Sequence, residues 1–512
     1  MRRLSCAALV AVLALVVAAC GGTSSSGTTP GAGKRGGTLT LAPLVQAQPW
    51  DLKDAGIGNN AQYYQPVYDS LLRLDAKGNP VANLATAWKY DKTQTQLTLT
   101  LKTGIKFTDD AAFDAAAVKA NLEHTRTGAN EAAGQLKIVK SVKVVNPTTA
   151  VVKLAAPDPS FVANLGNVAG MMASPQAIAS GALKQAPVGT GPYTLDTGAT
   201  TNGSVYTYVR NPGYWNAAAF PFDKIVLKPL TDPTAILNAL RSGQINGALM
   251  TNAKNIAPAK AAGLTVNKIT TGDVDGVYIW DREGKIVPAL ANVKVRQALN
   301  YAFDKNAIVK TAKQGYGEPT TQVFNKATGA FDTALDSKYT YDPAKAKQLL
   351  ADAGYPNGFD VTVPDLSPYF PDAQAAMEQE LKDIGIRVKV QKVPANQLIN
   401  DLLAGKFALS YFSLASFRPW DTITIQLKQD ALWNPLKSAD AKAQALIAKA
   451  QTTPAGAEQD ALYKQLNDYV VSQAWDAPWT QVQSAYATTK GIEITPFAFA
   501  PVPPIYNFKQ VG

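Results

Sequence analysis

The chain has 512 residues, of which 46% are hydrophobic and 17% charged, and its formal net charge is +10. This apolar content is enough for a large core, and the length predicts two to four domains. The lysines and arginines are scattered singly, without a basic stripe interleaved with aromatic residues, so the composition argues against a nucleic-acid partner.

The first residues have the parts of an export signal. Arg2 and Arg3 form a charged start, and residues 4–17 are an apolar run too short to predict a membrane span. We therefore interpret residues 1–19 as a signal peptide. The Val-Ala-Ala-Cys sequence that ends at Cys20 resembles the lipobox of bacterial lipoproteins, in which the cysteine carries lipid.

The cysteine count agrees with this interpretation. The other cysteine, Cys6, lies within the signal, so the mature chain offers Cys20 no disulfide partner. Two or three acyl chains give stable membrane anchoring that a single chain cannot. Residues 20–37 begin with this cysteine and are rich in Gly, Ser and Thr, which predicts a flexible tether. The expected location is the outer face of the cell membrane, through the lipid anchor.

After the tether, short strands and helices alternate. The apolar pattern predicts strands over residues 37–42 and 97–101, and a helix over residues 63–72. Asn146 and Pro147 predict the turn of a hairpin. Residues 61–180 therefore have the composition of a self-contained insert of strands and helices.

The clearest helix signal lies in residues 292–315. Four apolar residues, starting at Val295, recur at the spacing of one helix face. Asn292 can cap this helix, and Asp304 can end it and cap a second helix over residues 305–313.

The same reasoning predicts further elements in the second half of the chain. Helices are expected over residues 233–243, 342–354, 371–383 and 396–403 and as a pair within 438–472, and strands over 225–229, 386–393 and 407–413. The Pro-rich residues from 491 onward predict an extended ending.

Four motifs occur in an order that is typical of one family. They are PVGTGPY from Pro187, RNPGYW from Arg210, NVKVRQALNYAFDKNAIV from Asn292 and YDPAKAKQLLADAGYPNGFDV from Tyr341. With them, the chain resembles the family 5 extracellular solute-binding proteins, which are the peptide, nickel and oligosaccharide receptors of ABC importers. The resemblance covers essentially the whole mature chain.

The resemblance implies an α/β, two-lobed fold like that of periplasmic binding proteins, of type II and in the large family 5 form with an inserted subdomain. The expected division is lobe I in residues 38–60, 181–277 and 489–512, the inserted subdomain in 61–180 and lobe II in 278–488. No low-complexity linker interrupts the chain after residue 38, so we expect the lobes to be joined by direct crossings near residues 272–278 and 488–495.

Catalytic and metal chemistry is not predicted. His124 is the only histidine, and a lone histidine on a predicted helix is more often a surface or packing residue than a ligand. Neither a nucleophile–base set nor a zinc spacing can be assembled from this sequence. We expect no enzymatic activity, no cofactor and no bound metal.

The resemblance also implies where a ligand binds. Receptors of this family hold a ligand between lobes that close like a hinge, and their peptide-binding members offer strand edges to the ligand backbone. The expected cleft edges are Gly56, Ile57, Gly58 and Asn59 and Phe412, Ser413 and Leu414, and the expected walls are Tyr278, Trp280, Ser416, Phe417, Arg418 and Trp420. Plain core packing is the alternative for Phe412 and Trp280, and a solvated loop is the alternative for Arg418.

One position departs from the family. In the di- and oligopeptide members an aspartate after the second strand captures the α-amino group of the ligand, and here that position is Ala415. Asp421 can replace it only if the loop folds back. The resemblance then implies little discrimination between free and acetylated peptide N-termini. It leaves open blocked peptides, sugars stacked on Trp or Tyr, an anionic ligand held by Arg418 and a metal–chelator complex.

The expected function is that of a monomeric receptor that captures a peptide or peptide-like small solute and delivers it to the ABC permease. An oligosaccharide or metal-chelate receptor of the same fold is one alternative. A sensor or scaffold lipoprotein that delivers no cargo is another.

Overall fold

The largest sheet is built from strands that lie far apart in the sequence. The computed structural model describes residues 35–394, 396–495 and 497–511. In this part of the chain nine strands form one sheet in the order β16-β12-β17-β11-β1-β10-β9-β8, with β13 paired to β17. Their bounds are Thr38–Ala42 (β1), Tyr193–Leu195 (β8), Tyr206–Arg210 (β9), Lys224–Leu227 (β10), Gly247–Met250 (β11), Thr265–Ile279 (β12), Gly317–Pro319 (β13), Leu409–Ala415 (β16) and Ala477–Thr488 (β17).

The centre of this sheet is parallel and belongs to the first lobe. β1 pairs in parallel with β10 and with β11, and its Leu39 is fully buried in the core that also contains Tyr208. Helices α6 (Pro233–Arg241) and α7 (Ile256–Ala261) follow β10 and β11. Asp232 caps α6 as predicted, because its side chain accepts a backbone N–H of the first turn.

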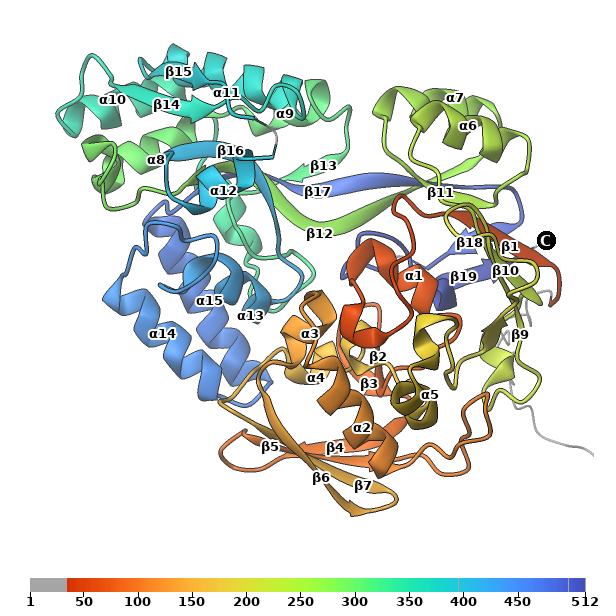
Figure 1. Cartoon of the computed structure of the whole chain (residues 1–512). Coiled ribbons are helices and arrows are strands. Elements are labelled where there is room, and N and C mark those ends of the chain that lie inside the picture. The colour runs from red at the N-terminus through yellow and green to blue at the C-terminus, as the bar shows by residue number, and fades with distance from the viewer. Residues whose placement is uncertain (1–34, 395, 496, 512) are drawn as a thin grey trace, which may run out of the picture. The chain divides into compact units, whose positions relative to one another are not determined.

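Two long antiparallel strands, β12 and β17, connect the lobes (Figure 1). At one end Ile269 and Tyr486 pack in the core of the first lobe. At the other end Ile279 and Trp479 pack in the core of the second lobe. Each strand therefore contributes to both cores, and the lobes are joined by one continuous ladder.

The crossings lie inside these strands. The register of the ladder shifts between Thr270 and Val274, within the start of the stretch expected for the first crossing. The return crossing was expected near residues 488–495. It lies earlier in the chain, inside β17. Those later residues already pack with the first lobe, since Ile492 belongs to its core.

The inserted subdomain has a core of its own, which includes Leu97, Leu122 and Phe161. Its sheet has the order β4-β5-β7-β6. The bounds of its elements are Ala85–Tyr90 (β4), Gln96–Leu101 (β5), Val139–Asn146 (β6), Thr149–Leu154 (β7), Ala115–Thr125 (α2), Glu131–Leu136 (α3), Phe161–Asn164 (α4) and Pro175–Ser180 (α5). The predicted hairpin turn at Asn146 and Pro147 is confirmed, because β6 ends there and β7 pairs with it.

The helix predicted over residues 63–72 is wrong. Only α1 (Ala61–Tyr64) is helical there, and the chain then turns into β2 (Leu72–Leu74), which pairs with β3 (Pro80–Ala82). Pro66 explains the difference, because it lacks the backbone N–H that would continue the helix.

The second lobe contains a series of α-helices between residues 293 and 403. Their bounds are Val293–Ala302 (α8), Lys305–Thr311 (α9), Pro343–Asp352 (α10), Pro371–Asp383 (α11) and Leu398–Leu403 (α12), with a parallel pair of strands, Asp360–Pro364 (β14) and Arg387–Gln391 (β15). Asn292, Asp304 and Asp342 cap α8, α9 and α10 through their side chains, as the sequence predicts.

A second core of this lobe packs α14 (Ala441–Thr452) and α15 (Ala457–Ser472) against α13 (Pro419–Thr422). The chain then returns through β17 to the first lobe, where Ile492–Ile494 (β18) pairs with Phe508–Gln510 (β19). In the described part of the chain, no helix is long and apolar enough to cross a membrane.

Gly276→Ala should lower the free energy of unfolding by about 2 kcal/mol or more. Gly276 lies in β12 with φ +154°, and a β-carbon there would lie 2.5 Å from the carbonyl oxygen of Ala477 and 2.7 Å from the nitrogen of Trp479. Both are backbone atoms of the paired strand, so the ladder itself would have to shift. Urea denaturation measures the loss.

Gly213→Ala is the matched control. Its φ is not in the left-handed region, and the nearest atom to the added β-carbon would be Asn211 Oδ1 at 3.6 Å. We expect it to change stability by less than about 0.5 kcal/mol. Equal losses in the two variants would contradict the steric account.

Candidate ligand-binding site

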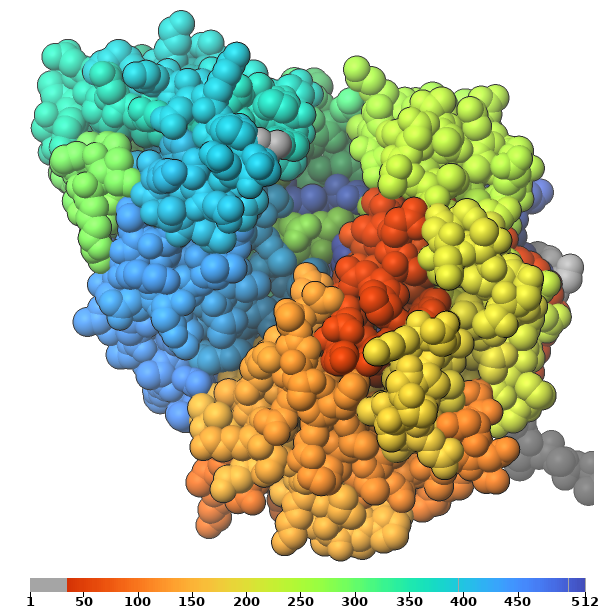
Figure 2. Space-filling view, viewed as in Figure 1, coloured from red at the N-terminus to blue at the C-terminus, as the bar shows by residue number. Residues whose placement is uncertain are grey.

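A pocket of about 720 Å³ lies where the first lobe, the inserted subdomain and the second lobe meet. The first lobe and the subdomain contribute residues 57–74 and 131–171 to its lining, and the second lobe contributes residues 415–425. Residues after 497 close one side. Figure 2 shows the surface hollowed between the second lobe (cyan and blue) and the first (red). The volume is within the range of pockets that enclose a small solute.

The pocket brings together some of the residues expected from the sequence and leaves others outside. Those in its lining are Ile57, Gly58, Asn59, Phe417, Arg418 and Trp420, together with Ala415. Those outside the lining are Gly56, Tyr278, Trp280, Phe412, Ser413, Leu414 and Ser416.

The aromatic residues outside the lining pack in the core of the second lobe. Tyr278 and Trp280 are 2% and 1% exposed, and their rings stack with centroids 5.2 Å apart. The indole N–H of Trp280 donates to Ser410 Oγ at 3.0 Å. Phe412 lies on Trp433, with ring centroids 4.7 Å apart. These contacts correspond to the plain packing considered above.

The loop from Gly56 to Asn59 is not an open strand edge. The backbone N–H of Ile57 donates to Glu131 Oε2 at 2.9 Å, so one of its donors already has a partner inside the protein. Gly58 begins a short 3₁₀ turn, Gly58–Asn60 (η2), with φ +61°. Gln48 packs behind Gly56, where a β-carbon would lie 2.8 Å from its Oε1.

One buried carboxylate in the wall, Asp69, was not anticipated from the sequence. The Tyr214 hydroxyl donates to Asp69 Oδ1 at 2.9 Å, and the Trp215 indole N–H donates to Oδ2 at 3.0 Å. The guanidinium of Arg73 lies 3.4 Å away. Burial raises the pKa of Asp69, while Arg73 and these donors oppose the rise.

Two of the sequence motifs meet at this carboxylate. Tyr214 and Trp215 end the RNPGYW motif, and Thr190 of the PVGTGPY motif lies 3.4 Å from Asp69 Oδ2. Gly189 of the same motif has no space for a side chain, since a β-carbon would lie 2.1 Å from the Val67 carbonyl oxygen. The motifs thus hold the chain segment that forms this wall of the pocket. The presence of both motifs in the sequence is the signal that could have pointed to Asp69.

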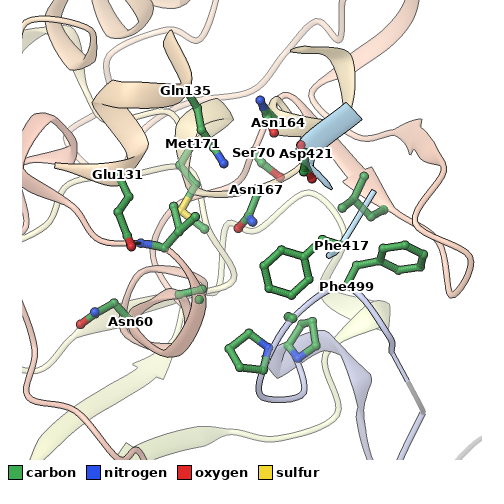
Figure 3. A pocket seen from close by; sticks show the side chains of 18 of the residues that line it. Asn60, Ser70, Glu131, Gln135, Asn164, Asn167, Met171, Phe417, Asp421 and Phe499 are labelled. Carbon is green, nitrogen blue, oxygen red and sulfur yellow. Dashed lines mark hydrogen bonds between the residues drawn. The ribbon is translucent and has the colours of Figure 1, made fainter. Parts of the chain in front are cut away.

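The second lobe contacts the subdomain through Arg418 and Asp421. These two side chains form an ion pair of 2.8 Å. Arg418 Nη2 also donates to Asn164 Oδ1 at 2.6 Å, and Ser160 Oγ donates to Asp421 Oδ1 at 2.6 Å. Both charged groups therefore have protein partners, and all four residues line this end of the pocket, where Figure 3 labels Asn164 and Asp421.

Asp158 lies beside this cluster in the pocket lining. Its carboxylate accepts the Ser160 backbone N–H at 2.9 Å. Burial raises the pKa of Asp158 to about 6, and the neighbouring charge of Asp421 adds to the rise. No salt bridge joins Asp158 to a cationic side chain among the described residues.

Metal ligands are not gathered in the part of the chain that the structure describes, where no group of three or more His, Cys, Asp or Glu side chains could hold an ion. His124 lies on α2, and its Nε2 contacts Asp51 Oδ1 at 2.7 Å. It therefore packs against the first lobe, away from the pocket lining.

Comparison with known proteins agrees with this architecture. The family described as "Bacterial extracellular solute-binding proteins, family 5 Middle" matches residues 79–430. A curated relative, the glutathione-binding protein GsiB of Salmonella paratyphi A, is 34% identical over 343 residues, which are 64% of this chain and 64% of GsiB. The matched region thus spans slightly less than two thirds of that relative's length.

Solved structures show the same fold. HbpA2 from Haemophilus parasuis has a TM-score of 0.82 at 21% identity, covering 93% of this chain and 100% of its own. DppA from Helicobacter pylori, in complex with the peptide STSA, has a TM-score of 0.74 at 21% identity, and the match covers 94% of this chain and 99% of DppA. The fold and the pocket define a two-lobed binding protein for a solute. The chain belongs to family 5 of the bacterial extracellular solute-binding proteins.

Asp158→Asn should stabilise the protein at pH 8 by about 1 to 3 kcal/mol, because the native state buries a charge that the unfolded chain leaves in water. The folded pKa of about 6 lies above the ordinary value, so the native carboxyl holds its proton more tightly than the unfolded one. The loss of stability caused by burying the ionised Asp158 therefore grows as the pH rises from about 4 to about 6, and it is complete above pH 6.

Urea denaturation at pH 4 and pH 8 tests this expectation. The stabilisation by Asp158→Asn should be near zero at pH 4. Asp430→Asn is the control, because the Asp430 side chain is 78% exposed, and we expect no gain at either pH. A gain that is equal at both values of pH would contradict the assignment to charge burial.

Proposed function

We propose that the protein captures a peptide or peptide-like small solute in this pocket and delivers it to the membrane subunits of an ABC importer. The observation that carries the proposal is the pocket itself, whose lining joins residues 57–74, from the first lobe and its inserted subdomain, to residues 415–425 of the second lobe. A solute held there contacts both lobes, so its binding favours their closure. Membership of the solute-binding family supports the same conclusion.

Closure has a physical basis in the two connecting strands. β12 and β17 allow rotation between the cores at the register shift after Thr270, where Gly272 has φ +80°. The contacts of Arg418 with Asn164 and of Asp421 with Ser160 form across the pocket when the lobes approach. We propose that these contacts are part of the closed state and break when the lobes open.

The relatives support a peptide-like ligand. GsiB is named for glutathione, which is a tripeptide, and the DppA structure contains the peptide STSA. The alternatives of an oligosaccharide and of a metal chelate stay open, since aromatic rings such as Phe417 and Phe499 also line the pocket. A sensor or scaffold lipoprotein is the remaining alternative. The protein works as a monomer in this proposal and catalyses no reaction.

The N-terminal predictions complete the proposal. The signal in residues 1–19, the acylated Cys20 and the tether as far as residue 34 lie outside the described residues. The last tether residues, 35–37, are described, and the Gly36 N–H donates to the Pro221 carbonyl oxygen at 2.8 Å. In this proposal the signal directs export of the receptor, and the acylated Cys20 anchors it to the outer face of the cell membrane, near its permease. The proposed division remains lobe I in residues 38–60, 181–277 and 489–512, the inserted subdomain in 61–180 and lobe II in 278–488.

Binding of a solute should contract the protein and raise its melting temperature. Two probes are glutathione and the peptide Ser-Thr-Ser-Ala, taken from the relatives. At a hundredfold excess over the dissociation constant, binding adds about 2.7 kcal/mol to stability. Solution scattering should show a smaller radius of gyration in the same sample. Tight binding with an unchanged scattering curve would argue against lobe closure.

Cys20→Ser should abolish the partition of the protein into detergent, because the thiol is the proposed site of lipid attachment. Intact mass spectrometry of the wild-type protein should show a diacylglyceryl group on a chain that starts at residue 20. Cys6→Ser serves as control, since Cys6 lies in the segment that is removed, and should leave partition unchanged. An unmodified wild-type chain that begins elsewhere would contradict the anchor.

A further inference from the structure

Four side-chain hydrogen bonds join the inserted subdomain to the second lobe beside the pocket. Each has one partner in the subdomain and the other in α14, in α13 or in the residue before α13. They are Asn164 with Arg418, Ser160 with Asp421, the Pro157 carbonyl oxygen with Gln451 at 3.0 Å, and Gln94 with the Thr452 carbonyl oxygen at 2.6 Å. All four must break when the second lobe moves away from the subdomain. We call this set of hydrogen bonds the subdomain contact.

Asp158 lies in the middle of the subdomain contact. The second lobe bonds to the chain on both sides of this residue, through Gln451 at the Pro157 carbonyl oxygen and through Asp421 at the Ser160 hydroxyl. The second lobe therefore covers Asp158 in this arrangement of the lobes. Separation of the lobes returns the Asp158 carboxylate to water.

The charges around Asp158 do not balance. Ser160 binds two carboxylates at once, because its backbone N–H donates to Asp158 Oδ1 at 2.9 Å and its hydroxyl donates to Asp421 Oδ1 at 2.6 Å. The neighbouring cation is Arg418, whose Nε donates to Asp421 Oδ2 at 2.8 Å. No salt bridge to Asp158 is formed among the described residues. Approach of the lobes thus places a second carboxylate, without a cationic partner, beside the first.

The other titratable groups that face Asp158 are two tyrosines. Tyr90 comes from β4 of the subdomain, and Tyr463 comes from α15 of the second lobe. Burial raises the pKa of both hydroxyls, and the charge of Asp158 adds to the rise. Both side chains are therefore neutral at pH 8, and neither supplies a charge that offsets Asp158.

We propose that protonation of Asp158 favours the closed form of the receptor, so that the lobes close more readily in acid than at alkaline pH. The inference rests on the proposed function, because it assumes that the lobes open and close around this pocket. In the open form the ionised carboxylate is in water and apart from Asp421. In the closed form it loses that water and lies beside a like charge. Since the solute favours the closed form, acid should also strengthen solute binding.

Closure is then coupled to one proton. Burial raises the pKa of Asp158 to about 6 in this arrangement, whereas an exposed aspartate titrates near pH 4. The closed form holds the proton more tightly, so its advantage is complete below about pH 4 and is lost as the pH rises through about 6. Between pH 5 and pH 8 the ratio of closed to open molecules should fall about tenfold.

Solution scattering of the unliganded protein at pH 5 and pH 8 tests the proposal. The radius of gyration of the wild type should be larger at pH 8, because a larger share of the molecules is open. Asp158→Asn should remove this dependence and give the smaller radius at both values of pH. The amide is neutral throughout this range, and its oxygen can still accept the Ser160 N–H.

Glu380→Gln is the matched control. Burial raises the pKa of Glu380 to about 7, so this carboxyl titrates in the same range of pH. Its Oε2 accepts the Asp304 backbone N–H at 3.2 Å, and both residues belong to the second lobe. Closure leaves these surroundings unchanged, so the variant should keep the response of the wild type to pH.

A wild-type radius of gyration that is equal at the two values of pH would overturn the inference. A response to pH that persists in Asp158→Asn, or that disappears in Glu380→Gln, would overturn it as well. A protein that contracts with glutathione or Ser-Thr-Ser-Ala but does not respond to pH would retain the proposed function and lose this inference alone.

Discussion

The antiparallel ladder between β12 and β17 is the constraint on which the rest of the structure depends. Each strand is packed at one end into the first lobe, at Ile269 and Tyr486, and at the other into the second, at Ile279 and Trp479. A strand held in two cores cannot slide, because a shift of one residue would turn every buried side chain to the wrong face. In the proposed closure, rotation takes place at the irregular stretch after Thr270, where the register of the ladder shifts.

Asp69 shows how residues of the family motifs can stabilise the wall of the pocket. A buried carboxylate is costly unless it is hydrogen-bonded and paired, and here donors come from Thr190, Tyr214, Trp215 and Arg73. These donors come from three stretches of the chain, so the carboxylate ties them into one wall. The motifs that identify the family are in this respect structural, and they leave the selection of the solute to other residues.

Local features could be predicted directly from the sequence, whereas only part of the pocket lining could be predicted. Caps at Asn292, Asp304 and Asp342 were correct, because a cap depends only on the few residues that follow it. Tyr278 and Trp280 lie in the core and not in the pocket lining, since alternation along a strand says which residues share a face but not which face meets the cleft. Glu131 and Asp158 could not be foreseen, because only the tertiary fold brings α3 and residues 158–164 to the loop after β16.

The same dependence on tertiary pairing decides what charge the pocket offers. From the sequence, Arg418 was a candidate ligand for an anionic solute, and the chain as a whole has a net charge of +10. In the fold, Arg418 is held by Asp421 and Asn164, so its charge serves the contact between the second lobe and the subdomain. An arginine that joins two lobes in this way is neutralised inside the wall. The carboxylates left over, and not the total charge of the chain, then set the sign of the field that a solute meets.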